Sequence, residues 1–387
     1  MPSLFDPVTL GSTISLRNRI CMGSMTRNRC VDDSKPSDAH IKHYATRARE
    51  GAGLIVAEGT FVYLHGSEYP FAPMMFNQEH AKAWKKVTDA VHDEGGIIFF
   101  QPWHPGRVQN ENMPLLKDNT YPVLAPSKVP APRGKYRDLP GTPGHSAEIT
   151  EIEDPRVIVE QYRHSVSLAK EAGFDGIELL SQGGYLLHNF LSSRSNTRTD
   201  QYGGTPQNRC RFTLEVLDAI ISIWGPHRVG IKICPCDDFQ ASAVSYTEMT
   251  ETYTHIIPEC MARKVAFVNL SRRGSPGHET EPRPGGCDLP AGYNPLEQFG
   301  GMVKYPGSKT LLMVNQDYTV EEAAKLVEEG KIDLISFGRL FVYNPDLVSR
   351  IKENVPLAQN DRGGWVYYGP YETVEKGYND WPVSEEP

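Results

Sequence analysis

The sequence lacks several features that would place it in a common class of binding protein. No run of basic residues is present, and the net charge of −8 is spread over 387 residues, so neither nucleic acid nor an anionic membrane is an expected partner. No apolar run approaches the roughly 20 residues that a membrane-spanning helix needs. The first residues contain neither the charged nor the apolar segment of a secretory signal. We therefore expect a cytoplasmic protein.

Cysteine and glycine motifs are also sparse. The seven cysteines are scattered, and Cys234 and Cys236 are separated by one residue, which suits neither a disulfide framework nor a zinc site. We expect reduced cysteines and no bound metal. No Gly-x-Gly-x-x-Gly motif follows a strand-like run, which disfavours an open dinucleotide-binding sheet.

Eight short apolar runs alternate with helix-like segments. Amphipathic stretches such as residues 79–93, 155–172 and 206–223 lie between the runs. This alternation favours a closed (β/α)8 TIM barrel over an open sheet, and we expect residues 1–387 to form one domain. The runs comprise residues 19–23, 54–57, 97–100, 177–180, 229–233, 267–270, 311–314 and 334–337.

Two segments fall outside this alternation. Residues 8–16 alternate like a strand, and a turn at Arg17 and Asn18 leads to residues 19–23, which predicts an N-terminal β-hairpin. Residues 108–154, after the third run, are rich in proline, glycine and charge. An insertion of this length in a compact domain predicts a loop that caps the substrate.

Polar residues at the ends of the runs predict the site, because the chemistry of such barrels collects at the carboxyl ends of the strands. They include amides, a hydroxyl, cations near the last two strands, and glycines that let a ligand approach the backbone. From residue types alone, the ligand is a flavin mononucleotide or a phosphorylated sugar. The residues are Ser24, Met25, Thr26, Gly59, Gln101, Lys232, Asn315, Gly338 and Arg339.

Four longer motifs resemble those of the old yellow enzymes, which are flavin-dependent ene-reductases. They are Gln101-Pro-Trp-His-Pro-Gly-Arg107, Asn196-Thr-Arg-Thr-Asp-Gln-Tyr-Gly-Gly204 with Asn208-Arg-Cys-Arg-Phe212, Phe337-Gly-Arg-Leu-Phe-Val-Tyr-Asn-Pro-Asp346, and Gly377-Tyr-Asn-Asp380. The resemblance covers essentially the whole chain. It implies an FMN-bearing barrel, a monomer or homodimer, that passes hydride from NADPH to an activated C=C bond of a small molecule.

The resemblance also implies roles for the residues at the strand ends. Thr26 would donate a hydrogen bond near the flavin C4=O, and Gly59 and Gln101 would meet the flavin edge. Lys232 stands where the family usually has an arginine, so the positive charge is kept but the planar, two-pronged donor group of the arginine guanidinium is lost. Ser24 and Met25 belong to the same cofactor set. The ribityl phosphate would be bound by Asn315, Gly338 and Arg339.

On the substrate side, the resemblance implies a tyrosine that protonates the α-carbon and a pair of donors for the activating oxygen. Tyr185 occupies the tyrosine position, and a phenol is protonated at neutral pH. The donor pair is missing, because its positions hold Leu180 and Gly183, whose side chains cannot donate. Loss of one such donor elsewhere costs about 2.7–4 kcal/mol, so simple enones should be reduced poorly unless another group substitutes.

Several interpretations of the missing pair remain open. The protein is a reductase for a specialised α,β-unsaturated carbonyl, or a flavin-dependent isomerase, dehydrogenase or cyclase of secondary metabolism, or a flavin-binding protein without catalysis. In the first case another donor must replace the pair. The candidates are Ser181, Gln182, His104, Arg272 and Arg273.

Three further expectations concern the surroundings of the site. Trp103 and Arg272 are expected to contact the substrate. Tyr371 is expected to do so as well, because the family places an aromatic residue six positions before the C-terminal Gly-Tyr pair. The acidic doublet Asp237 and Asp238 is expected to be a solvated loop.

Overall fold

Eight parallel strands close into a barrel in the computed structural model, which describes residues 1–66, 69–132, 134, 136, 139–274, 288–369 and 371–384. Each strand pairs with the next one along the chain, and β14 closes the barrel by pairing with β3. The predicted (β/α)8 barrel is therefore confirmed. Its strands are β3 (Ile20–Met22), β4 (Leu54–Val56), β6 (Ile98–Phe100), β10 (Gly176–Ser181), β11 (Val229–Ile233), β12 (Phe267–Ser271), β13 (Leu311–Asn315) and β14 (Leu334–Phe337).

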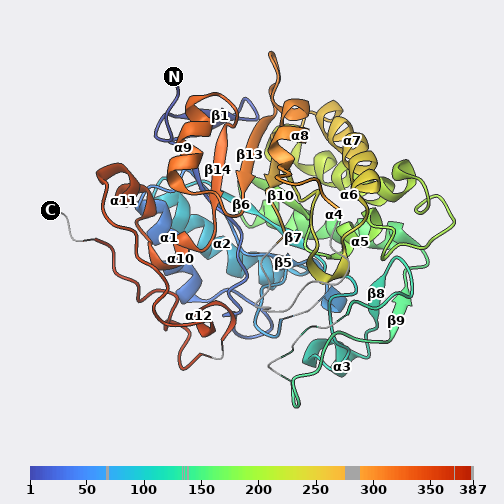
Figure 1. The fold of residues 1–387 in the computed structure, drawn as a ribbon. Coiled ribbons are helices and arrows are strands. Elements are labelled where there is room, and N and C mark those ends of the chain that lie inside the picture. The colour runs from blue at the N-terminus through green and yellow to red at the C-terminus, as the bar shows by residue number, and fades with distance from the viewer. Residues whose placement is uncertain are drawn as a thin grey trace.

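Helices surround the barrel, as Figure 1 shows. Several of them begin at a side chain that accepts a backbone N–H of the first turn, as Asp154, Thr205 and Ser245 do. None of the helices in the described part of the chain is long and apolar enough to cross a membrane. The longer helices are α1 (Asp38–Arg49), α2 (Gln78–Asp93), α4 (Pro155–Glu171), α6 (Pro206–Trp224), α7 (Tyr246–Ala262), α8 (Pro295–Val303) and α9 (Val320–Glu328), and the shorter ones are α5 (Leu186–Leu191), α10 (Leu340–Tyr343), α11 (Leu347–Glu353) and α12 (Trp365–Tyr368).

The N-terminal hairpin is present, but its turn is not where the sequence predicts it. β1 (Val8–Leu10) pairs antiparallel with β2 (Ile14–Leu16), so the chain turns before residue 14 and not at Arg17 and Asn18. Residues 19–23 contribute the barrel strand β3 in place of a hairpin arm. The hairpin closes one end of the barrel, where the buried apolar side chains are Leu10, Ile14, Leu16, Cys21, Leu54, Val56, Phe99, Phe267, Met313 and Leu334.

The insertion at residues 108–154 contains regular structure. It holds α3 (Pro114–Asn119) and a parallel pair of short strands, β8 (Val123–Ala125) and β9 (Ile149–Glu151). In Figure 1 these elements lie across the molecule from β1. The buried Arg107 guanidinium donates to carbonyls of the insertion and to the carbonyls of residues 240 and 241 after β11, so it ties these two loops together.

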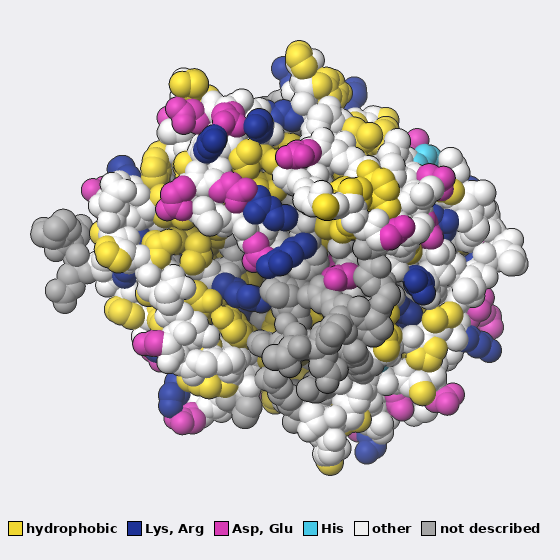
Figure 2. All heavy atoms as spheres, viewed as in Figure 1, with side chains coloured by type: hydrophobic (Ala, Val, Ile, Leu, Met, Phe, Trp, Pro, Cys, Tyr) yellow, Lys and Arg dark blue, Asp and Glu magenta, His cyan; other side chains and the backbone are white. Residues whose placement is uncertain are grey.

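Charge and cysteine are distributed as the sequence suggests. Acidic and basic side chains are interspersed over the face drawn in Figure 2. The cysteines that the structure describes are buried and free, and they are Cys21, Cys30, Cys210, Cys234, Cys236 and Cys260. Cys287 lies outside the described residues.

Inside the barrel, an apolar layer at the hairpin end is followed by a polar layer. Two glycines make room for aromatic rings in the apolar layer, because a Cβ on Gly176 would lie 2.4 Å from the Phe99 ring and one on Gly230 would lie 2.3 Å from the Phe267 ring. Polar side chains follow nearer the carboxyl ends of the strands. The buried members of this polar layer are Gln101, Glu178, Lys232, Asn269 and Asn315.

Gly230→Ala is expected to lower the free energy of unfolding by about 1–3 kcal/mol, because the new Cβ overlaps the Phe267 ring. Gly301 in α8 is the matched control, since nothing lies within 4 Å of a Cβ built there. Gly301→Ala is expected to raise the free energy of unfolding by up to about 1 kcal/mol through helix propensity. Denaturant titration measures both values, and equal effects of the two substitutions would contradict the packing argument.

Candidate active site at the barrel mouth

Closure of the barrel brings the predicted phosphate-end residues together. Residues 24–26 follow β3, and Gly338 and Arg339 follow β14, its neighbour in the sheet. A Cβ on Gly338 would lie 3.3 Å from the Met25 sulfur, so the two loops are in contact. Asn315 ends β13 on the other side of β14. Arg339 is exposed at the first turn of the short helix α10, an arrangement suited to a phosphate group.

The predicted ring-edge residues meet on the adjoining arc of the rim. Gly59 follows β4 and Gln101 follows β6, and these strands pair with each other. A Cβ on Gly59 would lie 2.8 Å from the Trp103 ring and 3.4 Å from Gln101 Oε1. A side chain at position 59 would therefore collide with the Trp103 ring, and glycine keeps this part of the rim free of a side chain.

A buried carboxylate holds the loop that carries Thr26. Glu58 Oε2 accepts the backbone N–H of Arg27 at 2.9 Å, and Glu58 Oε1 lies 3.4 Å from His40 Nε2. The buried Arg27 guanidinium donates to the carbonyls of Val366 and Gly377, which ties the same loop to the C-terminal segment. Sequence analysis missed Glu58 and Arg27, although both stand directly beside predicted site residues.

Hydrogen bonds connect the polar layer across the barrel. Glu178 accepts from Gln101 Nε2 and from Asn269 Nδ2, each at 2.8 Å. Asn315 Nδ2 donates to Asn269 Oδ1 at 2.6 Å, so Asn315 is fastened to this network rather than pointing freely at a phosphate. The network forms a polar floor beneath the mouth of the barrel.

Lys232 provides a cation in this floor. It pairs in register with Leu180 on β10 and with Asn269 on β12, and its side chain is only 9% exposed. Among the residues that the structure describes, none forms an ion pair or hydrogen bond with its ammonium group. An ammonium group without a described protein partner is available to a ligand group that carries negative charge, so the position fits the N1–C2=O side of a flavin. Together with the two rim glycines and the exposed Arg339, it makes the mouth suitable for FMN.

An aromatic cluster lines the mouth beside Leu180. The short strands β5 (Thr60–Phe61) and β7 (Pro102–Trp103) extend β4 and β6 beyond the barrel and stack the Phe61 and Trp103 rings at 4.6 Å. Tyr185 meets the edge of Trp103 at 4.8 Å. Leu180 is therefore part of an apolar wall, as expected if the site accepts an apolar ligand. The buried cluster comprises Phe61, Ala72, Met74, Trp103 and Leu180, with Leu64, Tyr69, Phe76, Leu115 and Tyr185 packed against it.

The backbone at Gly183 lies directly against the Tyr185 ring. Gly183 has a φ of +76°, and a Cβ there would lie 2.7 Å from Tyr185 Cε2. Glycine is thus required by both the left-handed backbone and the ring contact. An asparagine at position 183 would displace Tyr185, so the missing donor pair cannot be restored by substitution alone.

Asp237 anchors the loop that carries Gly183, which corrects the expectation of a solvated acidic doublet. Its side chain is 2% exposed, and Oδ2 accepts the Gly183 N–H at 2.5 Å while Oδ1 accepts the Phe239 N–H at 3.0 Å. His188 lies 3.8 Å from the carboxylate and accepts the Gly184 N–H through Nδ1 at 3.1 Å. Burial lowers the pKa of His188 to about 4, so the imidazole is neutral.

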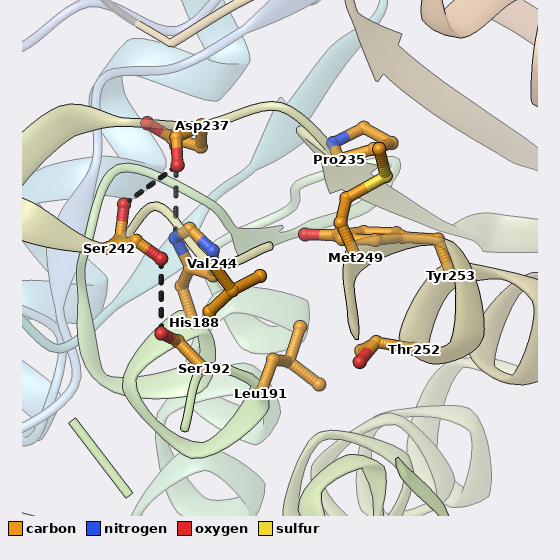
Figure 3. Close-up of a pocket in the computed structure, with 10 residues that line it drawn as sticks. All are labelled: His188, Leu191, Ser192, Pro235, Asp237, Ser242, Val244, Met249, Thr252 and Tyr253. Carbon is orange, nitrogen blue, oxygen red and sulfur yellow. Dashed lines mark hydrogen bonds and ion pairs between the residues drawn. The ribbon is translucent and has the colours of Figure 1, made fainter. Parts of the chain in front are cut away.

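Behind this loop lies a small cavity with room for about one water molecule. Figure 3 shows Asp237 and His188 on one side of it and Met249 and Tyr253 of α7 on the other. The cavity lies behind the 182–184 loop and is lined by none of the predicted cofactor residues, so we assign it to the support of that loop and not to substrate binding.

The two arginines after β12 are each held by an acidic side chain. Arg272 forms an ion pair with Glu322 of α9 and lies over the Tyr318 ring at 3.5 Å, and Arg273 forms an ion pair with Asp317. A role of Arg272 as a substrate ligand stays a prediction, and it would require the guanidinium to bind a substrate beside Glu322. Acidic partners contributed by the next loop and helix, which local sequence does not reveal, hold both cations.

Tyr371, predicted to contact the substrate, is bound to the protein through both its hydroxyl and its ring. Its hydroxyl lies 2.7 Å from the carbonyls of both Arg27 and Tyr367, and the Arg29 guanidinium covers its ring at 3.5 Å. Burial raises its pKa to about 12, as expected for a structural tyrosine. Tyr368 stacks on Tyr69 at 5.4 Å and so reaches the aromatic cluster instead.

Three of the proposed substitutes for the donor pair differ in burial and in hydrogen-bond partners. His104 is buried, accepts the Gly106 N–H through Nδ1, and has its Nε2 2.9 Å from His65 Nδ1. Ser181 is fully buried at the end of β10. Gln182 is half-buried, and its Oε1 accepts from Ser271 Oγ at 2.5 Å.

Comparison with known proteins gives a consistent family assignment. Residues 3–358 match the model of the NADH:flavin oxidoreductase / NADH oxidase family. The chain is 35% identical to 12-oxophytodienoate reductase 7 of Oryza sativa subsp. japonica, over 99% of this chain and 95% of the relative. It is also 35% identical to a probable flavin mononucleotide-dependent alkene reductase of Leishmania infantum, over 98% and 97% of the two chains.

Solved structures agree with this result. The old yellow enzyme homologue from Zymomonas mobilis superposes with a TM-score of 0.85 at 31% identity, covering 99% of this chain and 100% of that one. Morphinone reductase in complex with tetrahydroNAD superposes with a TM-score of 0.84 at 31% identity, covering 100% and 98%.

Gly183→Ala tests the contact between the Gly183 backbone and the Tyr185 ring. Gly204→Ala is the control, because Gly204 has a φ of +80° but nothing within 4 Å of its Cβ position. The control is expected to lose about 1 kcal/mol of unfolding free energy from backbone strain alone. Gly183→Ala is expected to lose about 1–3 kcal/mol more, because the ring must move. Equal losses in denaturant titrations would show that Tyr185 does not depend on glycine at position 183.

Proposed function

Because this chain belongs to the NADH:flavin oxidoreductase / NADH oxidase family and is an old yellow enzyme, we propose that it reduces the activated C=C bond of a specialised α,β-unsaturated carbonyl compound. That it is an FMN-dependent, NAD(P)H-using oxidoreductase follows from the family. The observation that carries the finer proposal is Tyr185, whose phenol stands at the mouth of the barrel beside Trp103.

When bound, FMN would supply hydride transfer, from NADPH through its N5 atom to the β-carbon of the C=C bond. On this proposal, residues 24–26, Gly59 and Gln101 would hold the edge of the ring. Lys232 would place a positive charge near the ring and so favour negative charge on the cofactor. Gly338 and Arg339 would hold the phosphate, at the end of the barrel where Asn315 is fastened to the polar layer.

Tyr185 is proposed to donate the proton to the α-carbon. It lies on the loop between β10 and α5, and this loop is fixed by the bond from the Gly183 N–H to Asp237 and by the Gly183–Tyr185 contact. Both fix the backbone from which the phenol projects. A general acid held in this way typically contributes about 10²–10⁴-fold to rate.

The surroundings support an apolar substrate. Leu180 and the aromatic rings beside it offer apolar surface, and Gln182 is a predicted substitute donor that is only half-buried. The relatives are named as reductases of 12-oxophytodienoate and morphinone and as an alkene reductase. These names support a carbonyl-activated alkene carried by a large apolar skeleton.

A flavin-dependent isomerase or dehydrogenase is the second candidate function. The observation that favours it is the combination of Leu180 in the apolar wall with Gly183 at a left-handed backbone position, because neither can hold a substrate oxygen. In that case the enzyme would rearrange or oxidise an elaborate substrate without a net addition of hydrogen.

Tyr185→Phe tests the proposed proton donor. Anaerobic mixing with NADPH should bleach the flavin at the same rate in the variant and the parent, because the phenol takes no part in that half-reaction. Reoxidation of the flavin by an enone should be slower by about 10²–10⁴-fold in the variant. Stopped-flow absorbance follows both steps.

Tyr305→Phe is the matched control, because Tyr305 is half exposed on the surface. It should leave both rates unchanged. A flavin that stays oxidised with NADPH would refute the reductase proposal as a whole, whereas unimpaired reoxidation in Tyr185→Phe would refute only the role of Tyr185.

A further inference from the structure

Glu178 is a carboxylate in the barrel interior that the reaction proposed above does not use. It is fully buried on β10. One of its partners, Asn269, lies on β12, and because β11 separates β10 from β12 in the sheet, this bond crosses the interior of the barrel. A buried carboxylate is costly unless hydrogen bonds compensate it, and the two amide N–H bonds at 2.8 Å do so.

The carboxylate fixes the direction in which the neighbouring amides point. An ionised carboxylate can only accept hydrogen bonds, so Gln101 and Asn269 must both turn their NH₂ groups toward Glu178. The carbonyl oxygen of Gln101 then faces the other way, and it lies 3.4 Å from the Cβ position of Gly59 at the rim. The carbonyl oxygen of Asn269 is left to accept from Asn315.

We propose that Glu178 is a positioning residue for the bound flavin: its carboxylate turns the Gln101 amide so that an acceptor oxygen faces the rim. The isoalloxazine of oxidised FMN has a single ring N–H group, and an acceptor oxygen is the partner that this group needs. Through Asn269 the same carboxylate fixes the amide of Asn315 on the far side of the barrel. Glu178 thus determines which groups of the polar layer donate hydrogen bonds and which accept them beneath the cofactor.

Charge gives Glu178 a second effect on the same cofactor. Its carboxylate is an anion beneath the mouth, whereas Lys232 is a cation in the same polar layer. A buried anion disfavours the anionic reduced flavin. Removal of the carboxylate should therefore move the flavin midpoint potential to a more positive value. The inference rests on bound FMN and not on the proposed substrate, so the two can fail separately.

Three variants test this inference. In Glu178→Gln, the new amide can accept a hydrogen bond from only one of the two NH₂ groups of Gln101 and Asn269. Its own NH₂ group then faces the other NH₂ group, so one of these amides must turn. In Asn269→Asp, two carboxylates face each other, which is unfavourable in a buried layer. The double variant removes both conflicts, because Gln at 178 accepts from Gln101 and donates to Asp at 269, which still accepts from Asn315.

The measurements are the release of FMN from the diluted holoenzyme, followed by flavin fluorescence, and the midpoint potential of the bound flavin. Each single variant is expected to bind FMN about tenfold more weakly, which corresponds to one lost hydrogen bond. Glu178→Gln should also have the more positive potential. The double variant should bind FMN within about threefold of the parent, because every donor again meets an acceptor.

Two results would overturn the inference. One is parent-like FMN binding and potential in Glu178→Gln, since that side chain keeps the shape of Glu178 and changes only its charge and polarity. The other is a double variant that binds FMN no better than the singles. If Glu178→Gln does not fold, the test is whether the double variant, Glu178→Gln with Asn269→Asp, folds and binds FMN. A folded, flavin-loaded double variant supports the inference, and an unfolded one contradicts it.

Discussion

The pairing of β14 with β3 is the constraint on which the rest of the structure depends. This contact closes the sheet, with Phe337 opposite Met22, and a closed parallel barrel gathers the carboxyl ends of all eight strands at one rim. Residues separated by more than 300 positions in the chain then form one site. The hairpin at the other end and the apolar layer above it fill the barrel, so that polar groups are confined to the mouth.

Burial makes this mouth selective in what it can bind. The Lys232 ammonium and the Glu178 carboxylate are held in the same layer, one without a described protein partner and one fully hydrogen-bonded. The unpaired cation favours a ligand that carries negative charge, and the hydrogen-bonded anion limits how strongly that charge is stabilised. Beside them the apolar wall with Leu180 accepts a substrate that has little polar surface.

The sequence was sufficient for the barrel and for the position of the rim residues at strand ends, because each apolar run and the polar residue after it are local features of the sequence. The roles of the rim residues stay predictions. The sequence was not sufficient where a partner comes from elsewhere in the chain. Asp237 belongs to an acidic doublet that the sequence predicts to be solvated, but its carboxylate is buried and accepts the Gly183 N–H. The sequence likewise does not reveal that Glu322 pairs with Arg272. The prediction of a hairpin turn at Arg17 and Asn18 was wrong for the same reason, because alternating apolar residues do not reveal which strand a segment pairs with.

Reaction of an enone with the holoenzyme and NADPH in D₂O, followed by the mass and label position of the product, distinguishes reduction from the alternatives. If the enzyme adds hydrogen across the C=C bond and Tyr185, whose hydroxyl exchanges with solvent, delivers the proton, the product gains one hydrogen from NADPH at the β-carbon and one deuterium from solvent at the α-carbon. A product that gains no hydrogen from NADPH would contradict the proposed reduction.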